Sequence, residues 1–211
     1  MEAQKNIRLL DLNEIKAFFS EIGEKPFRAK QVYEWLWKNS AMSFDDMSNL
    51  SLNIRNKLKE NFTLPSVKIK TSQISADKTI KNAFELVDGN IVEGVLIPSK
   101  TRMTACISSQ VGCSLTCKFC ATGKLKRLRN ISFDEIVDQV AHIKRQAEEN
   151  YKRPLTNIVY MGMGEPLLAY KSVMRSIELL TSKEGLDMAP RRITVSTAGI
   201  AKMIKKLADD G

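Results

Sequence analysis

All four cysteines of the 211-residue chain lie in one short stretch, and they constrain its folding more than any other feature. Cys113, Cys117 and Cys120 are spaced Cys-x₃-Cys-x₂-Cys, and a loop this short can bring three thiolates to one metal centre. Structural zinc sites normally have four protein ligands, and iron–sulfur clusters also favour four thiolates. The only histidine, His142, falls within a later predicted helix. We therefore expect a metal centre with one position left open to a ligand that is not protein.

The overall composition is that of an ordinary globular protein, with 43% hydrophobic and 27% charged residues. No apolar run approaches the roughly 18 residues that a membrane span requires. The N-terminus also lacks the apolar core of a signal peptide. Clustered cysteines in an unsecreted chain favour metal or redox chemistry over structural disulfides. We therefore expect a cytoplasmic protein without a membrane partner.

The net charge of +9 favours a polyanionic partner. Residues 124–129, directly after the cysteines, contain four cations, and this position favours phosphate contact. Further basic pairs occur at residues 144–145, 152–153 and 191–192. Each of these pairs, taken singly, is better explained as part of a solvated helix face.

Residues 1–70 are predicted to form a small helical accessory domain. Apolar residues follow a helical period after Asp11 and again after Pro26, a residue favoured at the start of a helix. Ser43 and Ser51 predict two more short helices. Basic side chains in and beside the second helix could touch nucleic acid. An accessory packing domain with an ordinary basic surface explains them equally well.

Residues 71–103 are predicted to form a β-hairpin extension. Two strands, at residues 79–87 and 91–97, flank an Asp-Gly pair, which is a strong turn signal. On the second strand, Glu93 shares a face with three aliphatic residues. Burial on that face would raise the pKa of its carboxyl group, so Glu93 is a candidate general base. The alternative is an edge residue whose carboxylate reaches solvent.

Residues 104–211 alternate between strand and helix patterns. Strands are predicted at residues 103–108, 157–161 and 192–196, and a helix pattern follows each of them. This order predicts a parallel sheet with right-handed crossovers. Glycines at the ends of the second and third strands would let the backbone approach a ligand closely, with Glu165 at the mouth of the sheet. Three parallel strands cannot close a barrel, so we expect the chain to be truncated.

The cysteine spacing, with Phe119 before the last cysteine, resembles the signature of the radical S-adenosylmethionine (SAM) superfamily. Longer motifs resemble the bacterial dual-specificity ribosomal RNA and transfer RNA adenine-C2 methyltransferase family. These motifs occur in the order of that family, at residues 27–37, 92–98, 106–123, 161–167 and 191–199. A sister family, which methylates C8 of the same ribosomal adenine, shares much of the pattern.

This resemblance implies a fold and a set of site residues. The implied fold is α/β, an incomplete (β/α)₆ partial barrel with its first three β/α units present, preceded by the helical domain and the hairpin. A [4Fe–4S] cluster would be held by Cys113, Cys117 and Cys120, and SAM would be bound by Gly164, Glu165 and Ser196. Glu93 would be the proton acceptor. Cys106 would be one of two mechanistic cysteines, and the other lies outside this chain.

The resemblance also implies a reaction and its partners. An electron from the cluster would cleave SAM to a 5′-deoxyadenosyl radical. A methyl group carried by the second cysteine would then be transferred to C2 of adenine through a protein–RNA adduct, which Cys106 resolves by forming a disulfide. The implied partners are 23S ribosomal RNA, transfer RNA and an electron donor such as flavodoxin, with the enzyme a monomer. The residues alone also allow a non-catalytic, metal-stabilised RNA-binding module.

Overall fold

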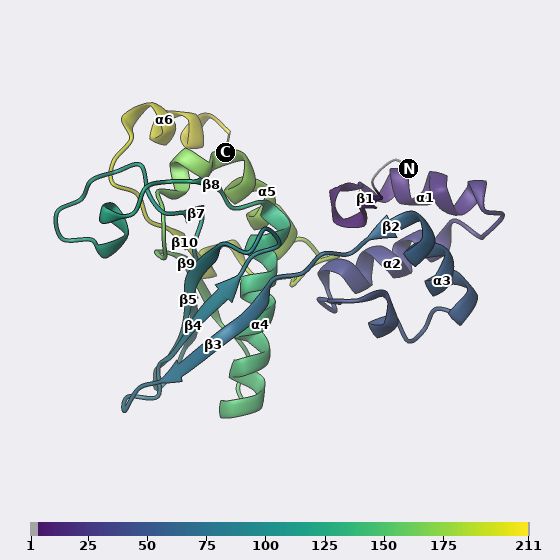
Figure 1. Cartoon of the computed structure of the whole chain (residues 1–211), viewed down its shortest axis with the longest axis horizontal. Coiled ribbons are helices and arrows are strands. Elements are labelled where there is room, and N and C mark those ends of the chain that lie inside the picture. Colours follow the sequence, from purple (N-terminus) through teal and green to yellow (C-terminus); the bar gives the residue numbers. More distant parts are fainter. Residues whose placement is uncertain (1–3, 211) are drawn as a thin grey trace. The chain divides into compact units, whose positions relative to one another are not determined.

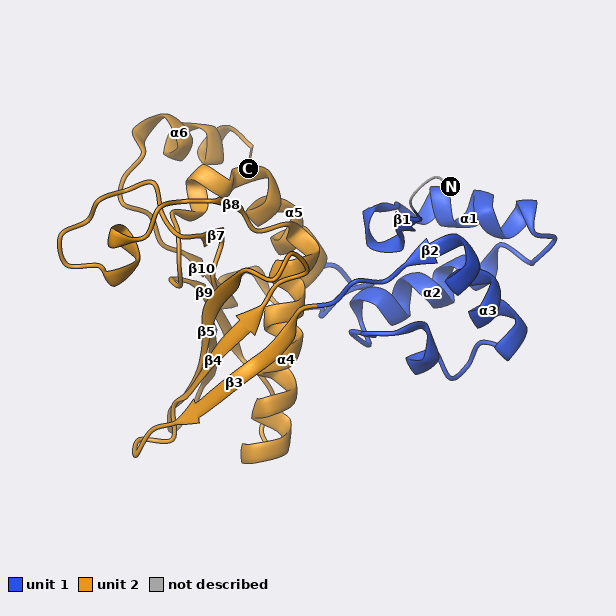
Figure 2. Ribbon diagram, in the orientation of Figure 1, with its two compact units in different colours: residues 1–66, 182–187 blue, residues 67–181, 188–211 orange. Residues whose placement is uncertain are grey.

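The computed structural model describes residues 4–210 and divides the chain into two compact units (Figures 1 and 2). The first unit consists of residues 1–66 and 182–187, and the second of residues 67–181 and 188–211. No helix within the described residues is long and apolar enough to cross a membrane.

The first unit is helical, as the sequence predicts. Its helices are α1 (Leu12–Glu21), α2 (Phe27–Trp37) and α3 (Leu52–Asn61). Asp11 caps α1 and forms a capping box with Glu14, which explains why the helix begins there. The helix predicted after Ser43 is only a short 3₁₀ turn, Phe44–Asp46. A two-residue parallel ladder between β1 (Lys5–Asn6) and β2 (Phe62–Thr63) completes the unit.

The second unit is built on a six-stranded mixed sheet with the order β10-β9-β6-β5-β4-β3. The strands are β3 (Lys68–Ile74), β4 (Ile80–Glu85), β5 (Ile91–Pro98), β6 (Met103–Cys106), β9 (Asn157–Tyr160) and β10 (Ile193–Val195). Strands β6, β9 and β10 pair in parallel, whereas β3 to β6 pair antiparallel. The predicted hairpin and the three predicted parallel strands are therefore confirmed.

Strand β3 is the one strand of this sheet that was not predicted from the sequence, and it crosses the expected boundary at residue 70. Its sequence, Lys-Ile-Lys-Thr-Ser-Gln-Ile, is polar, and all of its residues except Ile69 are exposed. An edge strand that buries so little has no clear apolar alternation to detect. Its position is fixed instead by pairing with β4, through a register shift between Ile69 and Thr71.

Each parallel strand is followed by a helix, as predicted: α4 (Phe133–Tyr151) after β6, α5 (Tyr170–Thr181) after β9, and α6 (Ala201–Asp209) after β10. Helix α4 begins with a capping box between Ser132 and Glu135. It packs against β5 and β6 and lies alongside the sheet in Figure 1. The segment between β6 and α4 contains the cysteines, so the sheet and this helix fix both ends of that segment.

Candidate functional site

The cysteine motif and two strand-end loops line one cavity of about 320 Å³. The six residues predicted to bind cluster or SAM all contribute to its lining, namely Cys113, Cys117, Cys120, Gly164, Glu165 and Ser196. The cavity lies where β9 and β10 end, because the loop at Gly162 follows β9 and Ser196 follows β10. This is the edge of a parallel sheet at which ligands commonly bind.

The cysteines lie on a loop that is closed at its neck by a short ladder. Strand β7 (Gln110–Val111) enters the loop and pairs antiparallel with β8 (Arg129–Asn130), which leaves it. Figure 1 shows the loop, in teal, extending away from the sheet. At Gly112 the backbone has a φ of 74°, and an added Cβ would overlap the carbonyl oxygen of Lys126. Only glycine fits this crossing of the two chain segments.

The chemistry of the thiols fits a metal centre. Hydrogen bonds from the backbone of Gly123, and then of Thr122, lower the pKa of Cys120. A lowered pKa favours the thiolate, which is the form that binds a metal. Among the described residues, no group of three His, Cys, Asp or Glu side chains stands close enough to share a metal ion. In a [4Fe–4S] cluster each thiolate binds a different iron, so the three thiols need not share one ion.

Glu165 joins the two strand-end loops through its carboxylate. The residue is only 3% exposed. Its Oε1 accepts a hydrogen bond from the N–H of Leu167 at 3.0 Å, and its Oε2 accepts one from the N–H of Ala198 at 2.7 Å. A carboxylate has about four acceptor positions, so two remain for a ligand. Glu165 can therefore hold the loops together and still face the cavity.

The side chain of Glu93 is not buried. Its side chain is 51% exposed and its Oε1 forms an ion pair with Lys81 Nζ at 2.6 Å. The other face of β5, which includes Val92 and Leu96, is buried instead. Both faces of this strand are apolar, so alternation alone could not identify the buried one. The structure matches the alternative in which the carboxylate reaches solvent.

Cys106 is half-buried on β6, where it stands opposite Val95 of β5 and Val159 of β9. Burial raises the pKa of its thiol, and a hydrogen bond from the backbone of Met161 opposes this shift only in part. Cys106 thus differs electrostatically from Cys120, whose thiol lies in the loop. All four cysteines are free thiols.

Arg129 belongs to the basic segment 124–129, but it faces protein rather than solvent. Its Nε donates to Asp88 Oδ2 at 2.6 Å, and its two terminal nitrogens donate to both oxygens of Glu135 at 2.7 and 2.9 Å. Burial alone would raise the pKa of Glu135, but the guanidinium and the backbone of Ser132 hold it below its ordinary value. Arg129 therefore fastens the exit of the cysteine loop to the hairpin turn and to α4.

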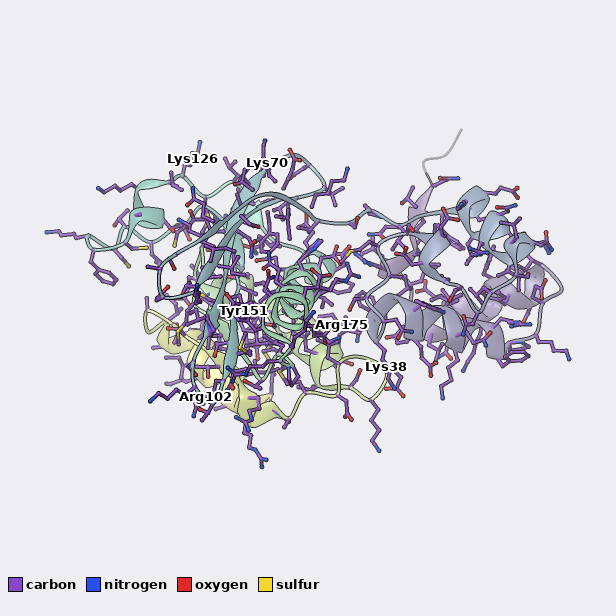
Figure 3. The ribbon with its side chains drawn as sticks, turned by 90° about the horizontal axis from the view of Figure 1, so that it is seen from below. Lys38, Lys70, Arg102, Lys126, Tyr151 and Arg175 are labelled. Atoms are coloured by element: carbon purple, nitrogen blue, oxygen red, sulfur yellow. The ribbon has the colours of Figure 1, made fainter. Side chains whose placement is uncertain are left out.

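The other three cations of this segment face solvent. Lys124, Lys126 and Arg127 are exposed, and Figure 3 shows the side chain of Lys126 extending outward. Two neighbouring leucines, Leu125 and Leu128, are 52% and 61% exposed. An alternation of exposed cations with apolar side chains suits a surface that meets both phosphates and bases.

Comparison with known families matches two models to this chain. The model described as "Ribosomal RNA large subunit methyltransferase N-terminal domain" matches residues 5–64, and the model of the radical SAM superfamily matches residues 107–211. A probable dual-specificity RNA methyltransferase RlmN from Cytophaga hutchinsonii is 61% identical over 207 residues, which cover 98% of this chain and 57% of that protein. The chain belongs to the RlmN family. Its place within the radical SAM superfamily follows from the same matches.

More distant relatives support the same family membership. The RlmN of Geotalea uraniireducens is 43% identical over 96% of this chain and 57% of its own length. A crystal structure of a radical SAM methyltransferase from Sphaerobacter thermophilus superposes with a TM-score of 0.87 at 38% identity, covering 97% of this chain and 60% of the other. The chain thus spans somewhat more than half the length of these RlmN-family and radical SAM relatives. The superposition confirms a partial radical SAM core, which follows a helical domain in the sequence.

Proposed function

We propose that this chain supplies the cluster-binding and SAM-binding residues of an RlmN-type enzyme that methylates C2 of adenine in 23S ribosomal RNA and in transfer RNA. The observation that carries the proposal is the single cavity shared by the Cys-x₃-Cys-x₂-Cys loop and the two strand-end loops. The names of the curated relatives support RNA as the substrate. The word dual-specificity in those names matches the C2-methylating family that the sequence resembles, and this supports C2 over C8 as the site of methylation.

In this proposal Cys113, Cys117 and Cys120 hold a [4Fe–4S] cluster. When bound, the cluster supplies the electron that activates SAM. Three thiolates lining one cavity, with the pKa of one of them lowered, fit this role. The absence of a fourth cysteine in the loop leaves a coordination position for SAM. Gly164, Glu165 and Ser196, which line the same cavity, would bind and orient SAM.

Glu93 and Cys106 are proposed to act on the RNA. The carboxylate of Glu93 is exposed, so it can accept a proton from a bound base without any opening of the sheet. Cys106 would form the disulfide that releases the product, together with a second cysteine outside this chain. Burial favours the neutral thiol of Cys106, which keeps this group unreactive until a partner is placed beside it.

The partners follow from the same proposal. The exposed cations at Lys124, Lys126 and Arg127 would contact RNA phosphates next to the site. The helical unit, which matches the family's N-terminal domain, would provide a second RNA-contacting surface. An electron donor such as flavodoxin would reduce the cluster. We expect the enzyme to act as a monomer in the cytoplasm.

Anaerobic reconstitution with iron and sulfide tests the proposal on the 211-residue chain. We expect about four irons per chain and a SAM-dependent change in the electron paramagnetic resonance spectrum of the reduced cluster. Cys117→Ser should lose iron, whereas the control Cys106→Ala should retain it. Binding of one zinc ion without iron would instead support a metal-stabilised RNA-binding module and refute the enzyme.

The site of methylation needs a separate measurement. Mass spectrometry of digested RNA, after reaction with a protein that contains the second cysteine, distinguishes 2-methyladenine from 8-methyladenine. In that protein we expect Cys106→Ala to accumulate the covalent RNA adduct, which is visible as a shifted band on a denaturing gel.

A further inference from the structure

Gln110 is a fully buried amide placed between the cysteine loop and the loop that follows β9. Its Nε2 donates a hydrogen bond to Oδ1 of Asn130 at 2.8 Å, and its Oε1 accepts one from the backbone N–H of Glu165 at 2.9 Å. Asn130 lies in β8, at the exit of the cysteine loop. One side chain therefore bonds both to the exit of the cysteine loop and to the loop that follows β9.

The backbone around Gln110 is also in contact with the loop after β9. The N–H groups of Ser109 and Gln110 both donate to the carbonyl oxygen of Met163, at 2.9 and 3.1 Å. Gly164 has a φ of 95°, and a Cβ added there would overlap the Cβ of Gln110. The loop at Gly164 therefore sits directly on Gln110, without room for a side chain between them.

The amide of Gln110 is matched to its two partners. It accepts from one N–H and donates to one oxygen, which a carboxylate or an apolar side chain cannot do at the same time. A polar group buried without a partner is costly, so both bonds have to be present together. Asn130 is held in turn, since its Nδ2 donates to the carbonyl oxygen of Leu168 at 3.3 Å. Displacement of either loop would thus break a bond made by a fully buried group.

We propose that Gln110 is a positioning residue that fixes the backbone of Gly164 and Glu165 relative to the cysteine loop. The part of this inference that concerns SAM rests on the proposed function. If the two loops are held by one amide, order in one loop favours order in the other, and this coupling is reciprocal. A cluster in the cysteine loop would then improve SAM binding, partly through Gln110.

Two variants of Gln110 and one matched control test this inference. Gln110→Met has a similar volume but makes neither bond, and Gln110→Asn keeps the amide but is too short to reach both partners. Asn82→Leu is the control, because Asn82 is also fully buried and its amide pairs with Gln146 and not with either loop. Circular dichroism selects the variants that fold.

The first measurement needs neither iron nor SAM. Hydrogen exchange of the Glu165 amide should be at least tenfold faster in Gln110→Met than in the unmodified chain, and unchanged in Asn82→Leu. Gln110→Asn should also exchange faster, and it decides the question if Gln110→Met does not fold. Unchanged exchange at Glu165 in the folded Gln110 variants would overturn the inference.

The second measurement uses the chain reconstituted with iron and sulfide. Iron content should be the same in the Gln110 variants and the control, whereas the dissociation constant for SAM should rise at least fivefold in the Gln110 variants only. Unaltered SAM affinity in folded, iron-loaded Gln110 variants would refute the coupling. If the unmodified chain takes up no iron, the proposed function fails, while the exchange result still decides whether Gln110 positions the loop.

Discussion

The carboxylate of Glu165 accepts the backbone N–H of Ala198 at 2.7 Å, and this bond joins the loops that follow two adjacent parallel strands. The other carboxylate oxygen accepts the N–H of Leu167 in its own loop. Because both oxygens already have backbone partners, the same group that faces the cavity also holds its wall together. Changes at Glu165 should therefore affect both ligand binding and folding.

Glu165→Gln should show both effects. An amide has one acceptor oxygen, so one of the two backbone N–H groups loses its partner, at a cost of about 1–3 kcal/mol in the free energy of unfolding. We also expect weaker SAM binding at unchanged iron content. The control Glu178→Gln alters an exposed carboxylate that pairs only with Arg175 on the same helix, and it should change stability by less than about 0.5 kcal/mol. Equal denaturant midpoints for the two variants would contradict this expectation.

Arg129→Met should strongly lower the free energy of unfolding. It leaves the carboxylate of Glu135, which is only 5% exposed, without its cation, at a cost of about 3 kcal/mol. Arg175→Met is the control, because its partner Glu178 is 66% exposed and such a pair is worth about 0–1 kcal/mol. Chemical denaturation at pH 7 measures both. If Arg129→Met lost less unfolding free energy than Arg175→Met, Arg129 would not hold the exit of the cysteine loop to the hairpin turn and α4.

The loss of stability in Arg129→Met should depend on pH. The guanidinium of Arg129 lowers the pKa of Asp88, and it holds the pKa of Glu135 below its ordinary value against the effect of burial. The unfolded chain therefore takes up these protons at a higher pH than the folded chain does. The stabilisation is complete above the ordinary carboxyl pKa of about 4 and is lost as the pH falls through the folded values. The difference in stability between Arg129→Met and the unmodified chain should thus shrink from pH 7 to pH 3.

Gly112→Ala should open the neck of the cysteine loop. Gly112 and Gly89 both have a positive φ, of 74° and 81°, but an added Cβ meets nothing within 4 Å at Gly89, whereas at Gly112 it overlaps the backbone of Lys126. Gly89→Ala should therefore cost only the conformational strain of about 1–2 kcal/mol. Gly112→Ala should cost about 1–3 kcal/mol more and should retain less iron after reconstitution. Similar stability and iron retention in both variants would show that the crossing tolerates a side chain.

The thiols should differ in their rates of alkylation. In the iron-free chain at pH 8, Cys120 should react faster with iodoacetamide than Cys106. The backbone of Gly123 lowers the pKa of Cys120, whereas burial raises that of Cys106, so at this pH Cys120 has the larger thiolate fraction. Peptide mass spectrometry over time gives the two rates. In guanidinium chloride the two alkylation rates should converge. Faster labelling of Cys106 than of Cys120 in the folded chain would contradict the predicted order of their thiol pKa values.

Elements specified by neighbouring residues could be predicted from the sequence. The start of α1 at Asp11 and the turn at Asp88 each depend on contacts within a few residues, and each is confirmed. The placement of the cysteine motif and the strand-end loops at one cavity was also accessible, because parallel strands present their carboxyl ends at one edge.

Features specified by distant residues could not be predicted. Strand β3 is polar and depends on β4 for its position. The exposed face of β5, which carries Glu93, could not be identified because both faces of that strand are apolar. The fold places Glu165 beside Gln110 and Asp88 beside Arg129, although the two residues of each pair are far apart in the sequence. These contacts give Gln110 and Arg129 their roles. A buried polar residue has no local pattern that distinguishes it from an exposed one.

The ladder between β7 and β8 has a consequence for how a cluster would be assembled. Since Gln110 pairs with Asn130 and Val111 with Arg129, the ends of the cysteine loop are already together in the folded chain. Closing a free loop of such a length costs on the order of 2–3 kcal/mol in chain entropy, and here that cost is met during folding. Iron and sulfide then have to order only the residues beyond the neck. A cluster held in this loop could therefore be inserted or lost while the sheet stays intact, so its assembly would be a local and reversible event.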